Sequence, residues 1–289
     1  MMSRVCGGLV LLGLLSACGD DDDGGSGAAD AAAGQADAAA DASPPVAICE
    51  GTSELRLAAL FGGGFVPVDA LVSNANGRPF LYIDGTCRYW ISGLPGQALT
   101  GTLGAEDEER LTSQLRVASW SSFYGGEWIG DGIDGPDLAL WRPDGRVDCY
   151  ASCQGPGVPE ALAGIGGSLH QAITILQAEA VPLDGPMRVL AFVQGFPDPL
   201  DEPPVIEWTY QPPLSELADP GDGDGAIEPA LIADPDAVAA MRAAWLAAQE
   251  AGFSFVAARD EDGVIYQLVA HDVLPFERDD GRGVDLPPP

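Results

Sequence analysis

The chain has 289 residues with 44 acidic and 13 basic side chains, which gives a formal net charge of −31 at pH 7. Every basic residue is an arginine, and the lack of lysine excludes Schiff-base chemistry, P-loop phosphate binding and protein-kinase activity. The strong negative charge repels phosphate backbones, which excludes nucleic acid as a partner, and it favours cations or basic partners. The two histidines, His170 and His271, are too few for a histidine-rich zinc site.

The chain opens with a pattern typical of an export signal. Arg4 supplies a basic head, and residues 5–15 are mostly apolar. This run suits a signal peptide but is too short for a helix across about 30 Å of hydrocarbon. It ends in Leu15-Ser16-Ala17-Cys18, which resembles the lipobox of bacterial lipoprotein precursors. The resemblance covers residues 1–18 alone.

The lipobox resemblance implies a signal peptide of residues 1–17, cleavage before Cys18 and a diacylglyceryl thioether on Cys18. Several acyl chains, each contributing about 0.8 kcal/mol per buried CH₂, hold a protein to a bilayer. We therefore expect a lipoprotein of the bacterial cell envelope, with the outer membrane favoured over the inner and the membrane as a partner through the anchor. The alternative is an ordinary secretory signal in which Cys18 is incidental.

Residues 18–45 are expected to form the lipidated cysteine and a disordered tether. The tract is mostly Asp, Gly and Ala, with no aromatic residue, so it has little apolar surface to offset the entropy of ordering. Its aspartates, including the run at residues 20–23, repel one another and extend the chain. Binding of a divalent ion by this run is the alternative.

Residues 46–284 are expected to form one α+β domain, followed by a Pro-rich tail at 285–289. The predicted fold has antiparallel sheets built from Asp-Gly hairpins, with about three helices packed on them. A Pro-, Gly- and Asp-rich stretch at 211–225 marks a candidate boundary between subdomains. The segment after it is too short for an independent core.

The first half of this domain begins with a predicted strand at 54–60 and a hairpin of strands 79–83 and 86–91 around Asp84-Gly85. Asp-Gly suits a two-residue type I′ turn because both central positions need positive φ. A helix is expected at 105–116, since its acidic first turn favours the positive end of the helix dipole.

An aromatic cluster follows this helix in a glycine-bearing stretch. Trp120, Tyr124, Glu127 and Trp128 form a candidate glycan-binding site, because exposed aromatic rings stack on sugars and carboxylates bind hydroxyl groups. With Asp131, Glu127 also forms a candidate carboxylate pair for glycoside hydrolysis. The alternative is that the tryptophans fill the core.

A second hairpin is predicted at 138–141 and 146–150 around Asp144-Gly145, close to two of the four cysteines left after removal of the signal and lipidation. An even set in an oxidising compartment predicts two disulfides, and four cysteines allow three pairings. Short spacing favours Cys149 with Cys153, and Cys49 with Cys87 is preferred because that bridge would join the start of the domain to the first hairpin. A four-thiolate zinc site is the alternative, although the spacing lacks the paired pattern of a zinc ribbon.

A helix is then expected to follow Ser168, whose hydroxyl caps its first turn. Gly166-Gly167-Ser168-Leu169-His170 approaches the nucleophile elbow of hydrolases, but His170 occupies the place of the closing glycine. We therefore assign Ser168 to capping. His271 is expected to be a hydrogen-bonded surface or edge residue near a strand end, in preference to a general base. Strands are also predicted at 187–194 and 205–210.

An acidic Gly-rich loop lies between these strands and the last helix. Asp222, Asp224 and Glu228 resemble half of an EF-hand calcium loop, but Pro220 and Leu231 stand where two strong ligands belong. The favoured interpretation is a hinge without a cofactor, and Ca²⁺ binding is the alternative.

The chain is expected to end in a helix and a third hairpin. The helix is predicted at 235–251, with Asp234 as N-cap and Pro235 at its first position. The hairpin is expected from strands 253–256 and 264–269 around Asp262-Gly263.

Because the sequence contains no complete catalytic motif, the favoured function is a non-catalytic binding or structural domain held at the envelope. Its partner is an unidentified protein, glycan or cation. The alternative is a carboxylate-based hydrolase or glycan-binding protein that acts on extracellular polymer.

Overall fold

The structure is a computed structural model of the whole chain. It describes residues 46–62, 79–94, 96–130, 137–150, 153, 155–193, 205–218, 229–251, 253, 255–279, 284 and 286. Residues 43–289 form one compact unit, separate from residues 1–42. The predictions for Cys18 and the tether therefore lie outside the described residues. The part that is described is α+β, as the sequence predicts.

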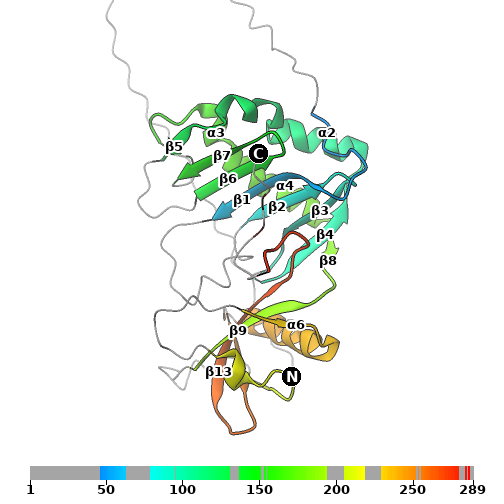
Figure 1. Cartoon of the computed structure of the whole chain (residues 1–289), viewed down its shortest axis with the longest axis vertical. Coiled ribbons are helices and arrows are strands. Elements are labelled where there is room, and N and C mark those ends of the chain that lie inside the picture. The colour runs from blue at the N-terminus through cyan, green and yellow to red at the C-terminus, as the bar shows by residue number, and fades with distance from the viewer. Residues whose placement is uncertain are drawn as a thin grey trace, which may run out of the picture. The chain divides into compact units, whose positions relative to one another are not determined.

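The first of two sheets in the compact unit has eight strands, in the order β5-β7-β6-β1-β2-β3-β4-β8 (Figure 1). Neighbouring strands run antiparallel except for β5 and β7, which are parallel. The strands are β1 (Leu55–Gly62), β2 (Phe80–Asp84), β3 (Arg88–Ser92), β4 (Ala98–Thr102), β5 (Glu127–Ile129), β6 (Asp137–Arg142), β7 (Gly145–Tyr150) and β8 (Val181–Pro182).

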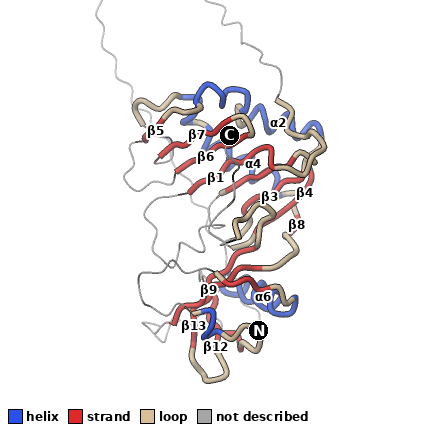
Figure 2. The backbone as a smooth tube through the Cα atoms, in the orientation of Figure 1, coloured by secondary structure: helices blue, strands red, loops and turns tan. Residues whose placement is uncertain are grey.

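Helices cover one face of this sheet, and their apolar side chains form the larger core with it (Figure 2). Leu57, Leu81 and Leu140 point to this face from three strands, while Leu115 and Leu169 meet them from the helical layer. The alternation of the strands therefore places every second residue in a common core. The covering elements are α2 (Ala105–Gln114), the 3₁₀ helix η1 (Val117–Phe123), α3 (Glu160–Ala163) and α4 (Ile165–Gln177).

The opposite face of the sheet is buried around β1, β2 and β3, where the C-terminal stretch packs on it. Leu274 belongs to this second core, and Phe276, Val284 and Leu286 pack against it. Together they cover large side chains such as Trp90, and all five residues of β2 are buried. Part of the segment expected as a tail beyond the domain, Leu286, thus packs on the domain.

The second sheet has five strands, in the order β10-β12-β13-β9-β11. Its strands are β9 (Met187–Val193), β10 (Val205–Glu207), β11 (Ala230–Ile232), β12 (Val256–Arg259) and β13 (Ile265–Asp272). Helices α5 (Leu214–Leu217) and α6 (Pro235–Glu250) share a core with it. The predicted cap of α6 is confirmed, since the Asp234 side chain accepts hydrogen bonds from the backbone N–H groups of Asp236 and Ala237.

The three predicted hairpins form, but none uses a type I′ turn at Asp-Gly. Arg142 pairs with Gly145, which leaves Pro143 and Asp144 in the turn. Proline holds φ near −65° and so excludes type I′. In the other two hairpins, Cys87 and Gly263 take the positive φ after a turn that begins at an aspartate, a pattern typical of a type I turn with a bulge.

The starts of two elements differ from the prediction by three residues or more. Helix α4 begins at Ile165 with Gly164 as N-cap, so Ser168 does not cap it. The backbone N–H of Ser168 already donates to the carbonyl of Gly164 within the helix. The strand expected at 253–256 instead begins at Val256, because β12 pairs with β13 from Val256 to Arg259.

Candidate functional site

Charged side chains gather at the end of β13, where the two sheets meet. Asp272, the last residue of β13, is only 1% exposed. One of its oxygens accepts from Arg242 Nη2 of α6 at 2.7 Å, and the other accepts from the backbone N–H of Ala98 in β4 at 2.9 Å. The backbone N–H of Asp272 also donates to the carbonyl of Gly96. This carboxylate therefore joins α6 and both sheets.

The chain before β4 needs a glycine at this junction. Gly96 has φ of 78°, and a Cβ there would lie 2.3 Å from the carbonyl oxygen of Ala270. Positive φ is costly for residues with a side chain, and the close approach leaves no space for one. Gly96 therefore lets the backbone before β4 lie directly against β13 at this residue.

A second ion-pair network holds the C-terminal stretch. Glu277 accepts from Arg188 Nε at 2.6 Å and from the backbone N–H of Leu274 at 3.1 Å. The Nε2 atom of His271 lies 3.4 Å from the same carboxylate. Arg188 also donates to the carbonyl of Asp279 at 2.7 Å. Through these bonds, Arg188 of β9 holds Glu277 and Asp279 of the segment that follows β13.

The pKa values of these two carboxyl groups shift in opposite directions. Burial raises the pKa of Asp272, and its bonds to Arg242 and Ala98 offset this only in part. Burial also acts to raise the pKa of Glu277, but hydrogen bonds from His271, Leu274 and Arg188 outweigh it, so the pKa of Glu277 is lowered. Glu277 is therefore held as a carboxylate, whereas ionised Asp272 carries a desolvation cost.

A cavity of about 240 Å³ opens beside the first network. Its wall is largely apolar and includes the edge of the Arg242–Asp272 pair. The lining residues are Leu94, Gly96, Gln97, Met187, Arg242, Ala243, Trp245, Leu246 and Asp272. Apolar walls with a few polar groups are typical of binding sites for small molecules. None of these residues stood out in the sequence as a candidate for ligand binding.

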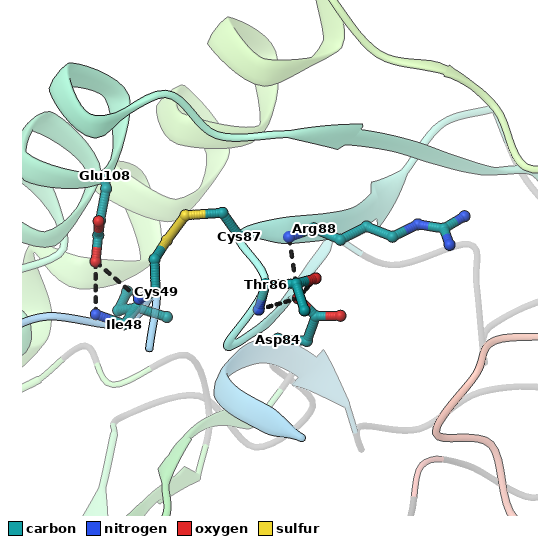
Figure 3. Close-up of a disulfide and its surroundings, with 7 residues drawn as sticks. All are labelled: Ile48, Cys49, Asp84, Thr86, Cys87, Arg88 and Glu108. Atoms are coloured by element: carbon teal, nitrogen blue, oxygen red, sulfur yellow. Dashed lines mark hydrogen bonds between the residues drawn. A yellow bond between two sulfur atoms is a disulfide. The ribbon is translucent and has the colours of Figure 1, made fainter. Parts of the chain in front are cut away.

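The predicted disulfides are confirmed, in the favoured pairing. Cys49 pairs with Cys87 and Cys149 pairs with Cys153, with Cα–Cα distances of 4.9 and 5.1 Å. Figure 3 shows the first bridge beside Glu108, whose carboxylate accepts from the backbone N–H groups of Ile48 and Cys49 at 2.6 and 2.9 Å. The bridge and Glu108 thus tie the start of the domain to β3 and α2.

The same three side chains form the one described group with metal-ligand spacing, Cys49, Cys87 and Glu108. Both sulfurs are engaged in the disulfide. The thiolate, not the disulfide, is the metal ligand, so this group is a structural crosslink. The four-thiolate zinc alternative is wrong for the same reason, because all four cysteines pair.

The aromatic cluster contributes to the core instead of forming an open platform. Trp120 is fully buried, and its Nε1 donates to the carbonyl of Leu115 at 2.9 Å. Trp128 is half-buried, packs on the same core and meets Phe123 edge to face at 5.9 Å. Trp120 is thus unavailable to a glycan. The side chain of Glu127 lies outside the described residues.

Tyr124 is bonded to a neighbouring turn. Its hydroxyl donates to Asp144 at 3.2 Å, and burial, followed by the Asp144 carboxylate, raises the pKa of Tyr124 to about 12. The phenol is therefore protonated at neutral pH and acts as a hydrogen-bond donor.

Two candidates from the sequence remain, His170 and the acidic loop. His170 lies in α4 with its Nδ1 3.0 Å from the carbonyl of Gly166, and its ring meets Phe61 at 5.3 Å. These contacts hold the ring against the helix and β1. The acidic loop of Asp222, Asp224 and Glu228 lies outside the described residues.

Comparison of the chain with protein families, with curated proteins and with solved structures finds no match. Within the described ranges, no helix has the length and apolar character needed to cross a bilayer.

Proposed function

We propose that this chain is a lipid-anchored protein of the bacterial cell envelope whose folded unit binds a partner without chemical turnover. The observation that carries the proposal is the pair of closed disulfides, since disulfides persist in oxidising compartments outside the cytoplasm. This agrees with export through the signal-like segment that ends at Cys18.

The geometry around Asp272 and Glu277 supports binding over catalysis. Both carboxylates are nearly fully buried, and their oxygens accept hydrogen bonds that join strands, helix and C-terminal stretch. They therefore stabilise the fold. The cavity beside Asp272 has largely apolar walls, which suit a ligand held by burial of apolar surface.

The glycan-binding alternative depended on an exposed aromatic cluster, and burial of Trp120 removes one of its rings. The hydrolase alternative also depended on Glu127 and Asp131, whose side chains lie outside the described residues. The binding function is therefore proposed for the cavity and its rim.

The anchor is tested by comparing two cysteine variants of the full chain expressed in a bacterium. Cys18→Ala should move the protein out of the washed membrane fraction, because the acyl chains supply the membrane affinity. Cys6→Ala is the matched control, since it also removes a cysteine from the N-terminal region and should leave the protein in the membrane. Equal membrane retention of both variants, or an unmodified Cys18 by mass spectrometry of the native protein, would overturn the anchor.

A further inference from the structure

The cavity lined by α6 and by Leu94, Gly96 and Gln97 has room for a small ligand. Its volume, about 240 Å³, lies below the roughly 300–1,000 Å³ of sites for drug-sized ligands. Segments distant in sequence build it, from the chain before β4, the start of β9, α6 and the end of β13.

Apolar side chains form both the floor and the rim of this cavity. Met187 and Trp245 are 4% and 6% exposed, whereas Leu94 and Leu246 are 45% and 50% exposed. Covering exposed apolar surface is favourable by about 25 cal/mol per Å². A ligand with an apolar body would therefore gain from contact with the two leucines at the rim and the buried pair beneath them.

The polar groups of the cavity include donors without acceptors. Nη2 of Arg242 bonds to Asp272 and to the carbonyl of Leu183, both at 2.7 Å. Its Nη1 lies 3.8 Å from the fully exposed Asp184, beyond hydrogen-bond distance. Nη1 is therefore an accessible donor of the cavity without a hydrogen-bond partner, whereas Nε of Arg242 and Nε1 of Trp245, which also lack a partner within the described structure, are buried and do not reach the cavity surface.

The Asp272 carboxylate at this site is already hydrogen-bonded to the protein. Each carboxylate oxygen of Asp272 accepts a hydrogen bond from the protein. An unpaired buried donor is costly, whereas a bond to a charged donor such as guanidinium is stronger than a neutral one. The Arg242 guanidinium therefore favours a ligand that supplies an acceptor, because a ligand with only donors leaves Nη1 of Arg242 unpaired.

We propose that this cavity binds a small molecule with an apolar body and a terminal hydrogen-bond acceptor, a carboxylate or an amide carbonyl. The acceptor meets the Arg242 guanidinium, and the apolar body lies between Leu94, Trp245 and Leu246. This assignment rests on the proposed binding function and specifies the ligand class for it.

The two acceptor classes differ in their response to salt. The chain carries a net charge of −31, so its field opposes an anionic ligand and leaves a neutral amide unaffected. Salt screens this repulsion. Affinity for a carboxylate should therefore rise with salt, and affinity for the amide should stay constant.

The test uses the full chain in lipid nanodiscs, with empty nanodiscs as the baseline for partition into lipid. Binding of hexanoate, hexanamide and hexylammonium is measured by ligand-observed NMR at high salt. We expect saturable binding of hexanoate, hexanamide or both, at one ligand per chain. Hexylammonium has the same apolar body but offers only donors, so it should bind at least about tenfold more weakly.

A matched pair of variants locates the ligand. Ala243 and Ala247 are both exposed on α6, one turn apart, and of the two only Ala243 lines the cavity. Ala243→Trp should obstruct the cavity and weaken binding at least about tenfold, because it removes the space for the apolar body. Ala247→Trp should change the affinity less than twofold. Thermal unfolding of both variants shows that each is folded.

Three results would overturn the assignment: no saturable binding of either acceptor ligand, equal affinity for hexylammonium, or equal loss of binding in the two tryptophan variants. These outcomes leave the membrane anchor standing, because Cys18→Ala tests it separately. New ligand resonances after incubation would instead contradict the proposal that the domain binds without turnover.

Discussion

The two disulfides should stabilise the fold by very different amounts. Cys49 and Cys87 are 38 residues apart, whereas Cys149 and Cys153 are four apart. In the chain-entropy treatment, a crosslink restricts the unfolded chain more when its loop is longer, which gives about 4 kcal/mol for the first bridge and about 2 kcal/mol for the second. The long loop should therefore dominate.

Each bridge can be measured alone in a variant that lacks the other. The free energy of unfolding is measured in guanidinium chloride, with and without dithiothreitol, for C149A/C153A and for C49A/C87A. Because each variant is its own reference, the packing lost by the alanine substitutions cancels. Reduction should cost C149A/C153A about 4 kcal/mol and C49A/C87A about 2 kcal/mol. Equal losses, or a larger loss for the short loop, would refute the loop-entropy reasoning.

Three further substitutions test local features of the fold. Asp234→Ala should lower the free energy of unfolding by about 1 kcal/mol, because two backbone N–H groups of α6 lose their acceptor; Asp234→Asn should lose much less, and equal losses would exclude a capping role. Glu277→Gln should destabilise most at neutral pH and progressively less as pH falls below 4.5, since a lowered pKa means that stability is lost on protonation. Asp272→Asn should show the opposite trend, with its largest cost at acid pH and a smaller cost as pH rises, since a raised pKa means that stability is lost on ionisation. Unfolding measured between pH 3 and 8, as a difference from the unmodified chain, checks both signs, and parallel pH curves would contradict them.

Turn and cap chemistry explains why several predictions hold. Asp234 caps α6 with bonds to residues two and three positions ahead, so the whole interaction lies within one helical turn. The hairpins at Asp84 and Asp260 likewise depend on an aspartate at the first turn position. The predicted type I′ turn was wrong in all three hairpins: Pro143 excludes positive φ in one, and Cys87 and Gly263 take the positive φ one position after a type I turn in the others.

The start of α4 shows the limit of local capping rules. Ser168 has a side chain suited to an N-cap, but the helix begins three residues earlier at Ile165. Residues Ile165, Leu169 and Ile173 all lie buried in the larger core. Packing of that apolar face stabilises the earlier turn, and tertiary packing generally outweighs a capping preference.

The role of the aromatic cluster also depended on the tertiary structure. The sequence allowed Trp120 to be either a ligand platform or a core residue, because both uses favour a large aromatic side chain. The packing of α2, η1 and the first sheet places Trp120 in the core. Residue type alone does not report exposure, since exposure depends on what packs above the residue.

The sequence by itself determined the α+β class, the capped last helix and the Cys149–Cys153 bridge, because these follow from periodicity, local hydrogen bonds and short spacing. Only the tertiary structure decided that Asp272 joins Ala98, 174 residues away, to Arg242, and that a cavity opens beside them. No sequence window contains those partners. The physical reason is that folding brings distant segments together, and a buried carboxylate must accept hydrogen bonds from the donors that those segments supply.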